Sequence, residues 1–125
     1  MNTKAGSRLA PEIFRQRLLL EGYFSIAVDQ QTVSRFLVAL AAELELRTYG
    51  EPVVFAPARG MGRDDNAGFD GFVPLIDSGI SIYVWSKARF VSLVIYTCKG
   101  FDEDRAGAFT REFFAIENDL VSHAF

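Results

Sequence analysis

Two residues with reactive side chains, Ser78 and Cys98, lie in or beside segments that have the pattern of β-strands. Ser78 belongs to the sequence IDSG (residues 76–79), a tight polar turn between two apolar, alternating segments. Asp, Ser and Gly are all common turn residues, so a plain hairpin turn explains this motif. A serine hydroxyl on a strained turn can also act as a nucleophile, which leaves a chemical role open. Cys98, taken alone, has the character of an inert buried thiol.

The composition argues against several other kinds of site. The 125 residues include one cysteine and one histidine, His123, so we expect no disulfide framework and no metal centre. A free thiol suits a reducing compartment. The formal net charge is −3 and the basic residues are scattered, which provides no basic patch for a nucleic-acid backbone.

The length and the N-terminus predict a small cytoplasmic protein. We expect a flexible tail over residues 1–10 and a single domain over residues 11–125. The N-terminus lacks the apolar region of a secretion signal. No apolar run approaches the ~18 residues that a membrane-spanning helix needs, so we expect no membrane partner.

The first half of the chain predicts a strand, a helix and a second strand. Residues 18–28 and 52–58 have strand composition, and residues 59–70 predict a long loop that is either mobile or functional. Between the strands, apolar residues recur with helical spacing, and Asp29 or Thr32 can cap this helix. The apolar stripe consists of Val33, Phe36, Leu37, Leu40, Ala41 and Leu44.

The second half predicts three strands and a helix. The strands span residues 71–76, 79–85 and 90–98, and the first two are joined at Asp77 and Ser78. A helix begins near Asp102, with an apolar set of Ala106, Phe109, Phe113, Ile116 and Leu120. The order of elements predicts an α+β fold, an antiparallel sheet with two helices packed on one face.

The residues around Ser78 resemble those of a known family. Gly68-x-Asp70-Gly71, a strand to Asp77-Ser78, ISIYVW and a strand ending in YTC follow one another in this chain. The pattern is similar to that of the bacterial S-adenosylmethionine decarboxylase proenzymes, which carry Gly-x-Ser-Gly, Glu-Ser-His, ISIHTWPE and FTCG. The spacing matches without gaps from Gly68 to Cys98, and the resemblance extends over most of the chain from about Gln16. It implies that family's two-layer sandwich.

The resemblance implies a cofactor that the chain makes from itself. In this family the serine attacks the preceding carbonyl to form an ester, and elimination then splits the chain and leaves a pyruvoyl group. Cleavage here would fall between Asp77 and Ser78, and the pyruvoyl group would derive from Ser78. This group would bind the substrate's amine and accept electrons as CO₂ departs. The cysteine matched by Cys98 would return a proton to the product.

Several residues depart from the family pattern. Tyr83 replaces the histidine that assists elimination, and a phenol is a weaker base than an imidazole at neutral pH, so we expect slow or absent processing. Asp70 replaces the serine of Gly-x-Ser-Gly; it is either a turn residue or, if it lies near the turn, a substitute base. Gly79 replaces a histidine, and Lys87 replaces a glutamate, which puts the usual substrate in question.

Further residues are candidates for substrate contact. Tyr83 and Trp85 lie two apart on a strand and share a face, and we assign them to the core, with an adenine-sized pocket as the alternative. Phe69 is a third aromatic candidate, and Glu21 could contact a ligand's amine. His123 is assigned to solvent.

Three functions remain open. The first is a pyruvoyl-dependent S-adenosylmethionine decarboxylase of polyamine biosynthesis, working as a homodimer with active sites near the subunit boundary, as the resemblance implies. The second is a non-processing, catalytically inactive paralogue that binds an adenosyl ligand or regulates a partner subunit. The third is a related decarboxylase of another amino acid, such as ornithine or arginine.

Overall fold

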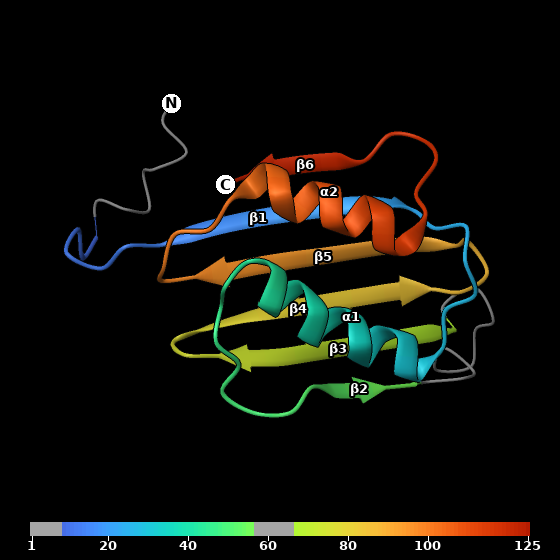
Figure 1. Cartoon of the computed structure of the whole chain (residues 1–125), viewed down its shortest axis with the longest axis horizontal. Coiled ribbons are helices and arrows are strands. Elements are labelled where there is room, and N and C mark those ends of the chain that lie inside the picture. The colour runs from blue at the N-terminus through green and yellow to red at the C-terminus, as the bar shows by residue number, and fades with distance from the viewer. Residues whose placement is uncertain (1–8, 57–66) are drawn as a thin grey trace.

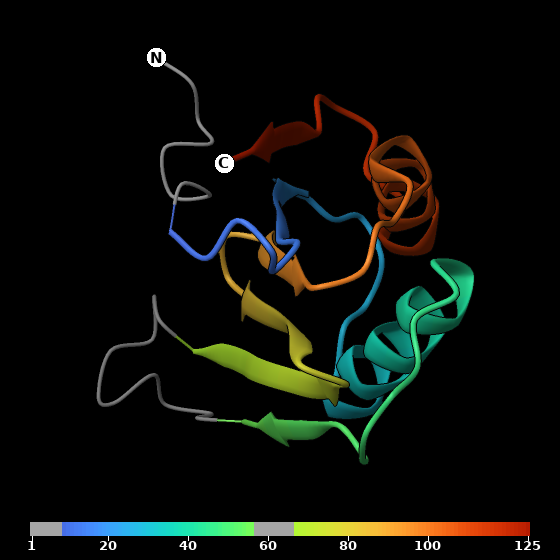
Figure 2. The ribbon, with the colours of Figure 1, turned by 90° about the vertical axis from the view of Figure 1, so that its left-hand side faces the viewer.

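A six-stranded antiparallel sheet forms one layer of the computed structural model, and two helices form the other (Figures 1 and 2). The structure describes residues 9–56 and 67–125. The helices are α1 (Gln30–Glu43) and α2 (Glu103–Phe114). The strands, in their order across the sheet, are β2 (Val53–Phe55), β3 (Gly68–Leu75), β4 (Ser78–Trp85), β5 (Phe90–Thr97), β1 (Gln16–Tyr23) and β6 (Val121–Ala124). The predicted α+β class and the placement of both helices on one face are confirmed.

The hydrophobic core lies between the sheet and the helices. Alternate residues of β5 are buried, as the period of a strand predicts, and the buried set is Val91, Leu93, Ile95 and Thr97. The α1 stripe packs against β2 and β3, and five of its members are fully buried: Val33, Phe36, Leu37, Leu40 and Ala41. One face of the sheet is therefore apolar and covered. No described element covers the other face, which we call the open face (Figure 2).

Both residues that the sequence identified as possible caps, Asp29 and Thr32, cap the start of α1. The backbone N–H of Thr32 donates to Asp29 Oδ1 (2.8 Å), and the backbone N–H of Asp29 donates to Thr32 Oγ1 (3.2 Å). Both residues therefore cap the helix together, as a capping box. The hydrogen bond from the Thr32 N–H holds the pKa of the Asp29 carboxyl below its usual value.

The two glycines of the Gly-x-Asp-Gly motif are required by packing. A Cβ atom on Gly68 would lie 1.8 Å from the backbone oxygen of Val84 on the neighbouring strand. A Cβ atom on Gly71 would lie 3.1 Å from Val33 and 3.2 Å from Leu37, both on α1. These glycines let β4 and α1 approach β3 closely, and their presence in the motif therefore has a structural reason.

Several element boundaries differ from the prediction. β1 ends at Tyr23 because its partner Phe90 is the first residue of β5, so residues 24–28 have no strand to pair with. α2 ends at Phe114, followed by Ala115 in the left-handed region, so two residues of the predicted apolar set, Ile116 and Leu120, lie beyond the helix.

Two predictions about connecting segments are only partly covered by the structure. β3 begins at Gly68, so Gly68–Asp70 belong to a strand and not to the predicted loop. Residues 59–66 of that loop, and residues 1–8 of the predicted tail, lie outside the described residues. The sequence also failed to predict β6, whose four side chains are all exposed and show no alternation.

Candidate active site

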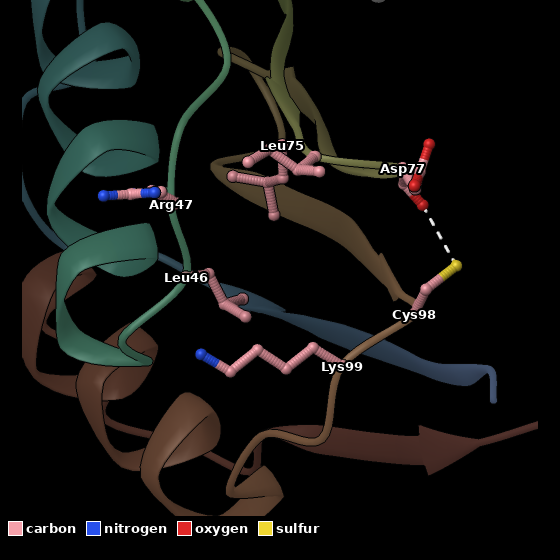
Figure 3. Close-up of a pocket in the computed structure, with 7 residues that line it drawn as sticks. Leu46, Arg47, Leu75, Asp77, Cys98 and Lys99 are labelled. Atoms are coloured by element: carbon pink, nitrogen blue, oxygen red, sulfur yellow. Dashed lines mark hydrogen bonds between the residues drawn. The ribbon is translucent and has the colours of Figure 1, made fainter.

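Ser78 lies at a strained hairpin turn. Cys98 forms hydrogen bonds with the Ser78 hydroxyl and with the backbone carbonyl of Asp77. It is the first residue of β4 and pairs with Leu75 across a two-residue turn, Ile76 and Asp77, so the turn lies one residue earlier than predicted. Asp77 has a φ of 54°, in the left-handed region that L-residues rarely adopt. The backbone N–H of Cys98 donates to Ser78 Oγ (2.9 Å), and the Cys98 thiol donates to the carbonyl oxygen of Asp77 (3.1 Å; Figure 3).

Two hydrogen-bond donors of Cys98 reach the Asp77–Ser78 peptide. The carbonyl that precedes Ser78 accepts a hydrogen bond from the Cys98 thiol, and such a donor stabilises negative charge that develops on the oxygen during attack. The Cys98 N–H holds the Ser78 hydroxyl oxygen at the same place. Among the described residues, no carboxylate or imidazole forms a hydrogen bond with the Ser78 hydroxyl. The hairpin thus holds a hydroxyl oxygen and a carbonyl whose oxygen accepts a hydrogen bond, and no base from the described part of the chain contacts that hydroxyl.

A second group of predicted residues lies on the open face. Asp70 and Tyr83 are direct cross-strand partners, and the same row continues through Ser92 to Glu21. Ser92 Oγ donates to the Glu21 carboxylate (2.8 Å). We call these four residues the open-face row. Tyr83 follows Ser78 by five positions on β4, which corresponds to about 16 Å along the strand.

The row corrects two interpretations of the sequence. Asp70 is not a turn residue, because it lies inside β3, and it is remote from the turn that contains Asp77. Tyr83 and Trp85 do not belong to the core: Tyr83 is 42% exposed and Trp85 is half-buried on the same open face. The reason is the register of β4, whose helix-facing positions are taken by Ile80, Ile82 and Val84.

The remaining candidates lie apart from both groups. Phe69 is adjacent to Asp70 in sequence but packs against the core on the other side of the sheet. His123 lies in β6, is exposed as expected, and stacks on Phe125 with ring centroids 6.2 Å apart. The described residues contain no group of three or more His, Cys, Asp or Glu side chains that could hold a metal.

Two cavities accompany these groups. The hairpin cavity, of about 330 Å³, is lined by Leu46, Arg47, Leu75, Ile76, Asp77, Cys98 and Lys99 (Figure 3). The open-face cavity, of about 280 Å³, is lined by Val53, Phe55, Asp70, Gly71, Phe72, Ser81 and Tyr83. Sequence reasoning missed Arg47 and Lys99, because neither residue belongs to a motif and only the fold brings them to the cavity that Asp77 also lines.

Comparisons with known proteins agree with the pattern around Ser78. The family model for S-adenosylmethionine decarboxylase matches residues 18–124. A similar solved structure is the adenosylmethionine decarboxylase from Aquifex aeolicus VF5, with a TM-score of 0.65 and 16% identity over 90% of this chain and 89% of that one. No curated protein matches the chain. Among the described residues, no helix is long and apolar enough to span a membrane. The family match covers most of the length, and the chain belongs to the S-adenosylmethionine decarboxylase family.

Proposed function

We propose that this chain is a pyruvoyl-dependent decarboxylase that processes itself between Asp77 and Ser78. The observation that carries the proposal is that Cys98 hydrogen-bonds both the Ser78 hydroxyl oxygen (2.9 Å) and the Asp77 carbonyl oxygen (3.1 Å). The left-handed backbone of Asp77 adds strain at the bond to be broken. A nucleophile, a polarised carbonyl and local strain therefore coincide at one peptide.

The proposed cleavage is balanced by atoms that the hairpin and water supply. Ser78 Oγ bonds to the carbonyl carbon of Asp77, the peptide C–N bond breaks, and the hydroxyl proton passes to the freed amino nitrogen, which gives an ester. Loss of the α-proton of residue 78 then breaks the Cβ–Oγ bond and releases residues 1–77 with a free carboxylate. Hydrolysis of the new N-terminus of residues 78–125 releases ammonia and leaves the pyruvoyl group.

The residues at the hairpin fit such a group. Its carbonyl supplies an electron sink for decarboxylation. The new N-terminus would begin β4 beside the Cys98 thiol, which lies within hydrogen-bond reach of the Asp77 oxygen in the intact chain. Cys98 is thus well placed to hold the proton that replaces CO₂ on the product.

S-adenosylmethionine is the proposed substrate, and the open-face cavity supports it. The cavity combines the rings of Phe55, Phe72 and Tyr83 with the carboxylate of Asp70. Aromatic rings can stack on a purine, and a carboxylate can accept hydrogen bonds from ribose hydroxyls. Decarboxylation of this substrate would place the protein in polyamine biosynthesis, in the cytoplasm.

A homodimer is part of the proposal because the two groups of residues do not meet in one chain. Asp70 and Tyr83 lie about 16 Å along the strand from Ser78. The open face also exposes large apolar side chains, a property typical of interaction surfaces; they include Tyr23, Val53, Phe55, Phe72, Tyr83, Tyr96, Val121 and Phe125. Two open faces packed about a two-fold axis would bury these side chains, and could bring Asp70 and Tyr83 of one copy to Ser78 of the other.

Intact-mass measurement of the purified wild-type chain tests the cleavage. We expect two fragments, residues 1–77 and a pyruvoyl-blocked 78–125, and CO₂ release from S-adenosylmethionine. Release from ornithine or arginine in place of S-adenosylmethionine would instead support the related decarboxylase of another amino acid. A full-length mass that persists after long incubation contradicts self-processing.

A non-processing paralogue is the second candidate, and one observation favours it. No carboxylate or imidazole of the described residues forms a hydrogen bond with the Ser78 hydroxyl, and Tyr83 replaces the family's histidine. Such a protein would keep the open-face cavity as a site for an adenosyl ligand or would regulate a partner subunit. Saturable binding of S-adenosylmethionine without CO₂ release would identify it.

The open face also gives a direct test of the homodimer. We expect the wild type to have twice the chain mass of 13.9 kDa in light scattering after gel filtration. Phe72→Glu places a charge on an open-face side chain that is 42% exposed, and should weaken the dimer by about tenfold or more because charge at the core of an interface is costly. Val38→Glu changes an α1 side chain of similar exposure (45%) and should leave the dimer intact. A wild-type monomer would contradict the proposal.

A further inference from the structure

The hairpin cavity has a charge distribution that the proposed cleavage does not use. Arg47 and Lys99 line it together with Asp77 and Cys98. In Figure 3 the guanidinium and the ammonium lie on the side of the helices, and the thiol lies at the opposite end beside Asp77. Leu46 and Leu75 lie between the two ends and make this part of the wall apolar; Ile76 also lines the cavity. The cavity is therefore amphipathic, with its positive end away from the scissile peptide.

Of the two cations, Arg47 has more hydrogen-bond donors available for a ligand. Within the described part of the chain, its guanidinium forms no hydrogen bond and no ion pair. A guanidinium has five N–H donors in a planar fork that matches a carboxylate. Its neighbour Leu46 is 8% exposed, so the backbone at this position is anchored in the core. Arg47 thus carries an unused carboxylate-binding group on an exposed side chain that extends from an anchored backbone.

Lys99 has a structural role but retains donors. Its Nζ donates to the backbone oxygen of Glu45 (3.3 Å), just beyond the C-terminal end of α1, where a cation offsets the helix dipole. An ammonium has three donors, so two remain for a ligand. The carboxylate of Glu45 does not line this cavity: its side chain is 83% exposed and lies 3.9 Å from Arg105. Asp77 is the single acidic residue among the lining side chains, so positive charge prevails.

We propose that the hairpin cavity binds a small organic carboxylate, with the anionic group on Arg47 and Lys99 and a short alkyl chain against Leu46 and Leu75. The two cations disfavour a diamine or a sulfonium compound at this end of the cavity, because like charges repel at short range. The bound acid would lie at the end of the cavity away from the Asp77–Ser78 peptide. The proposal concerns binding alone and does not depend on cleavage or decarboxylation.

Calorimetric titration of the Ser78→Ala chain with sodium butyrate tests this site. The variant is used because it is expected to stay uncleaved, so the sample contains only the full-length chain. We expect saturable binding of butyrate and none of butylammonium chloride at the same ionic strength. Arg47→Gln should raise the Kd by about tenfold or more, since hydrogen bonds to charged groups are among the stronger ones. Lys99→Gln should raise it less. Arg35→Gln removes the same charge from an exposed position on α1 outside the cavity and should leave the Kd unchanged.

Three results would overturn the proposal: no saturable butyrate binding, equal binding of butylammonium, or equal weakening by Arg35→Gln and Arg47→Gln. The last would indicate attraction by net charge and no defined site. Arg47 is exposed, so its variant should fold, and circular dichroism checks this. Failure of the wild type to cleave would not affect these results, and the absence of butyrate binding would leave the cleavage proposal untouched.

Discussion

Replacing Ser78 with alanine is expected to leave the chain uncleaved, as a single species of 13.9 kDa in an intact-mass measurement. The physical reason is that alanine has no oxygen to bond to the Asp77 carbonyl carbon, so the ester cannot form. The effect should be a complete loss of the 78–125 fragment, and with it of decarboxylase activity.

The matched control is Ser86→Ala, at the turn that joins β4 to β5. Ser86 makes a backbone hydrogen bond to Ala67 (3.0 Å) and is exposed, so its hydroxyl should be dispensable and cleavage should proceed as in the wild type. A 78–125 fragment from the Ser78→Ala chain would show that the break comes from another process, such as proteolysis, and would remove Ser78 from the chemistry.

Replacing Cys98 with alanine is expected to slow cleavage by about 10²-fold or more, the usual loss when one donor to a developing oxyanion is removed. The variant lacks the thiol that donates to the Asp77 oxygen, but it retains the backbone N–H that donates to Ser78 Oγ. The comparison therefore isolates the thiol. The fraction of cleaved chain, followed by mass spectrometry against time after refolding, gives the rate.

Cys98→Ser serves as the conservative variant. A serine hydroxyl is a donor on a shorter bond, so we expect a cleavage rate between those of the wild type and Cys98→Ala. All three chains retain the same backbone, so the order of their rates reports how closely each donor reaches the Asp77 oxygen. A hydroxyl is the stronger donor in itself, but the shorter Cβ–O bond leaves it farther from that oxygen than the thiol. A Cys98→Ala chain that cleaves at the wild-type rate would exclude the thiol from this step.

The two main departures from the family pattern occupy a single cross-strand pair. Asp70 and Tyr83 stand where the family has a serine and a histidine, and they lie directly opposite each other on β3 and β4. Side chains in such positions have Cβ atoms about 4.5–5.5 Å apart and influence each other. The exchange is best treated as one change to a shared site. Variants of the two residues should therefore be measured together as well as singly.

The sequence alone determined the elements whose pattern arises from local backbone geometry. The apolar spacing from Val33 to Leu40 and the alternation from Val91 to Thr97 predicted α1 and β5, because the periods of helices and strands are properties of a short segment. Asp29 was correctly identified as a cap for the same reason. The turn residues around Ser78 likewise predicted a hairpin at Asp77 and Ser78, although the turn itself is one residue earlier, at Ile76 and Asp77.

The tertiary structure decided which residues meet. Cys98 is 21 positions from Asp77 and contacts it because β5 lies next to β4, whereas Asp70, a motif neighbour, lies along the strand away from the hairpin. Arg47 joins the same cavity from beyond α1, and β6 forms only because β1 offers it an edge. Strand order and register depend on contacts between distant segments, and no local pattern contains them.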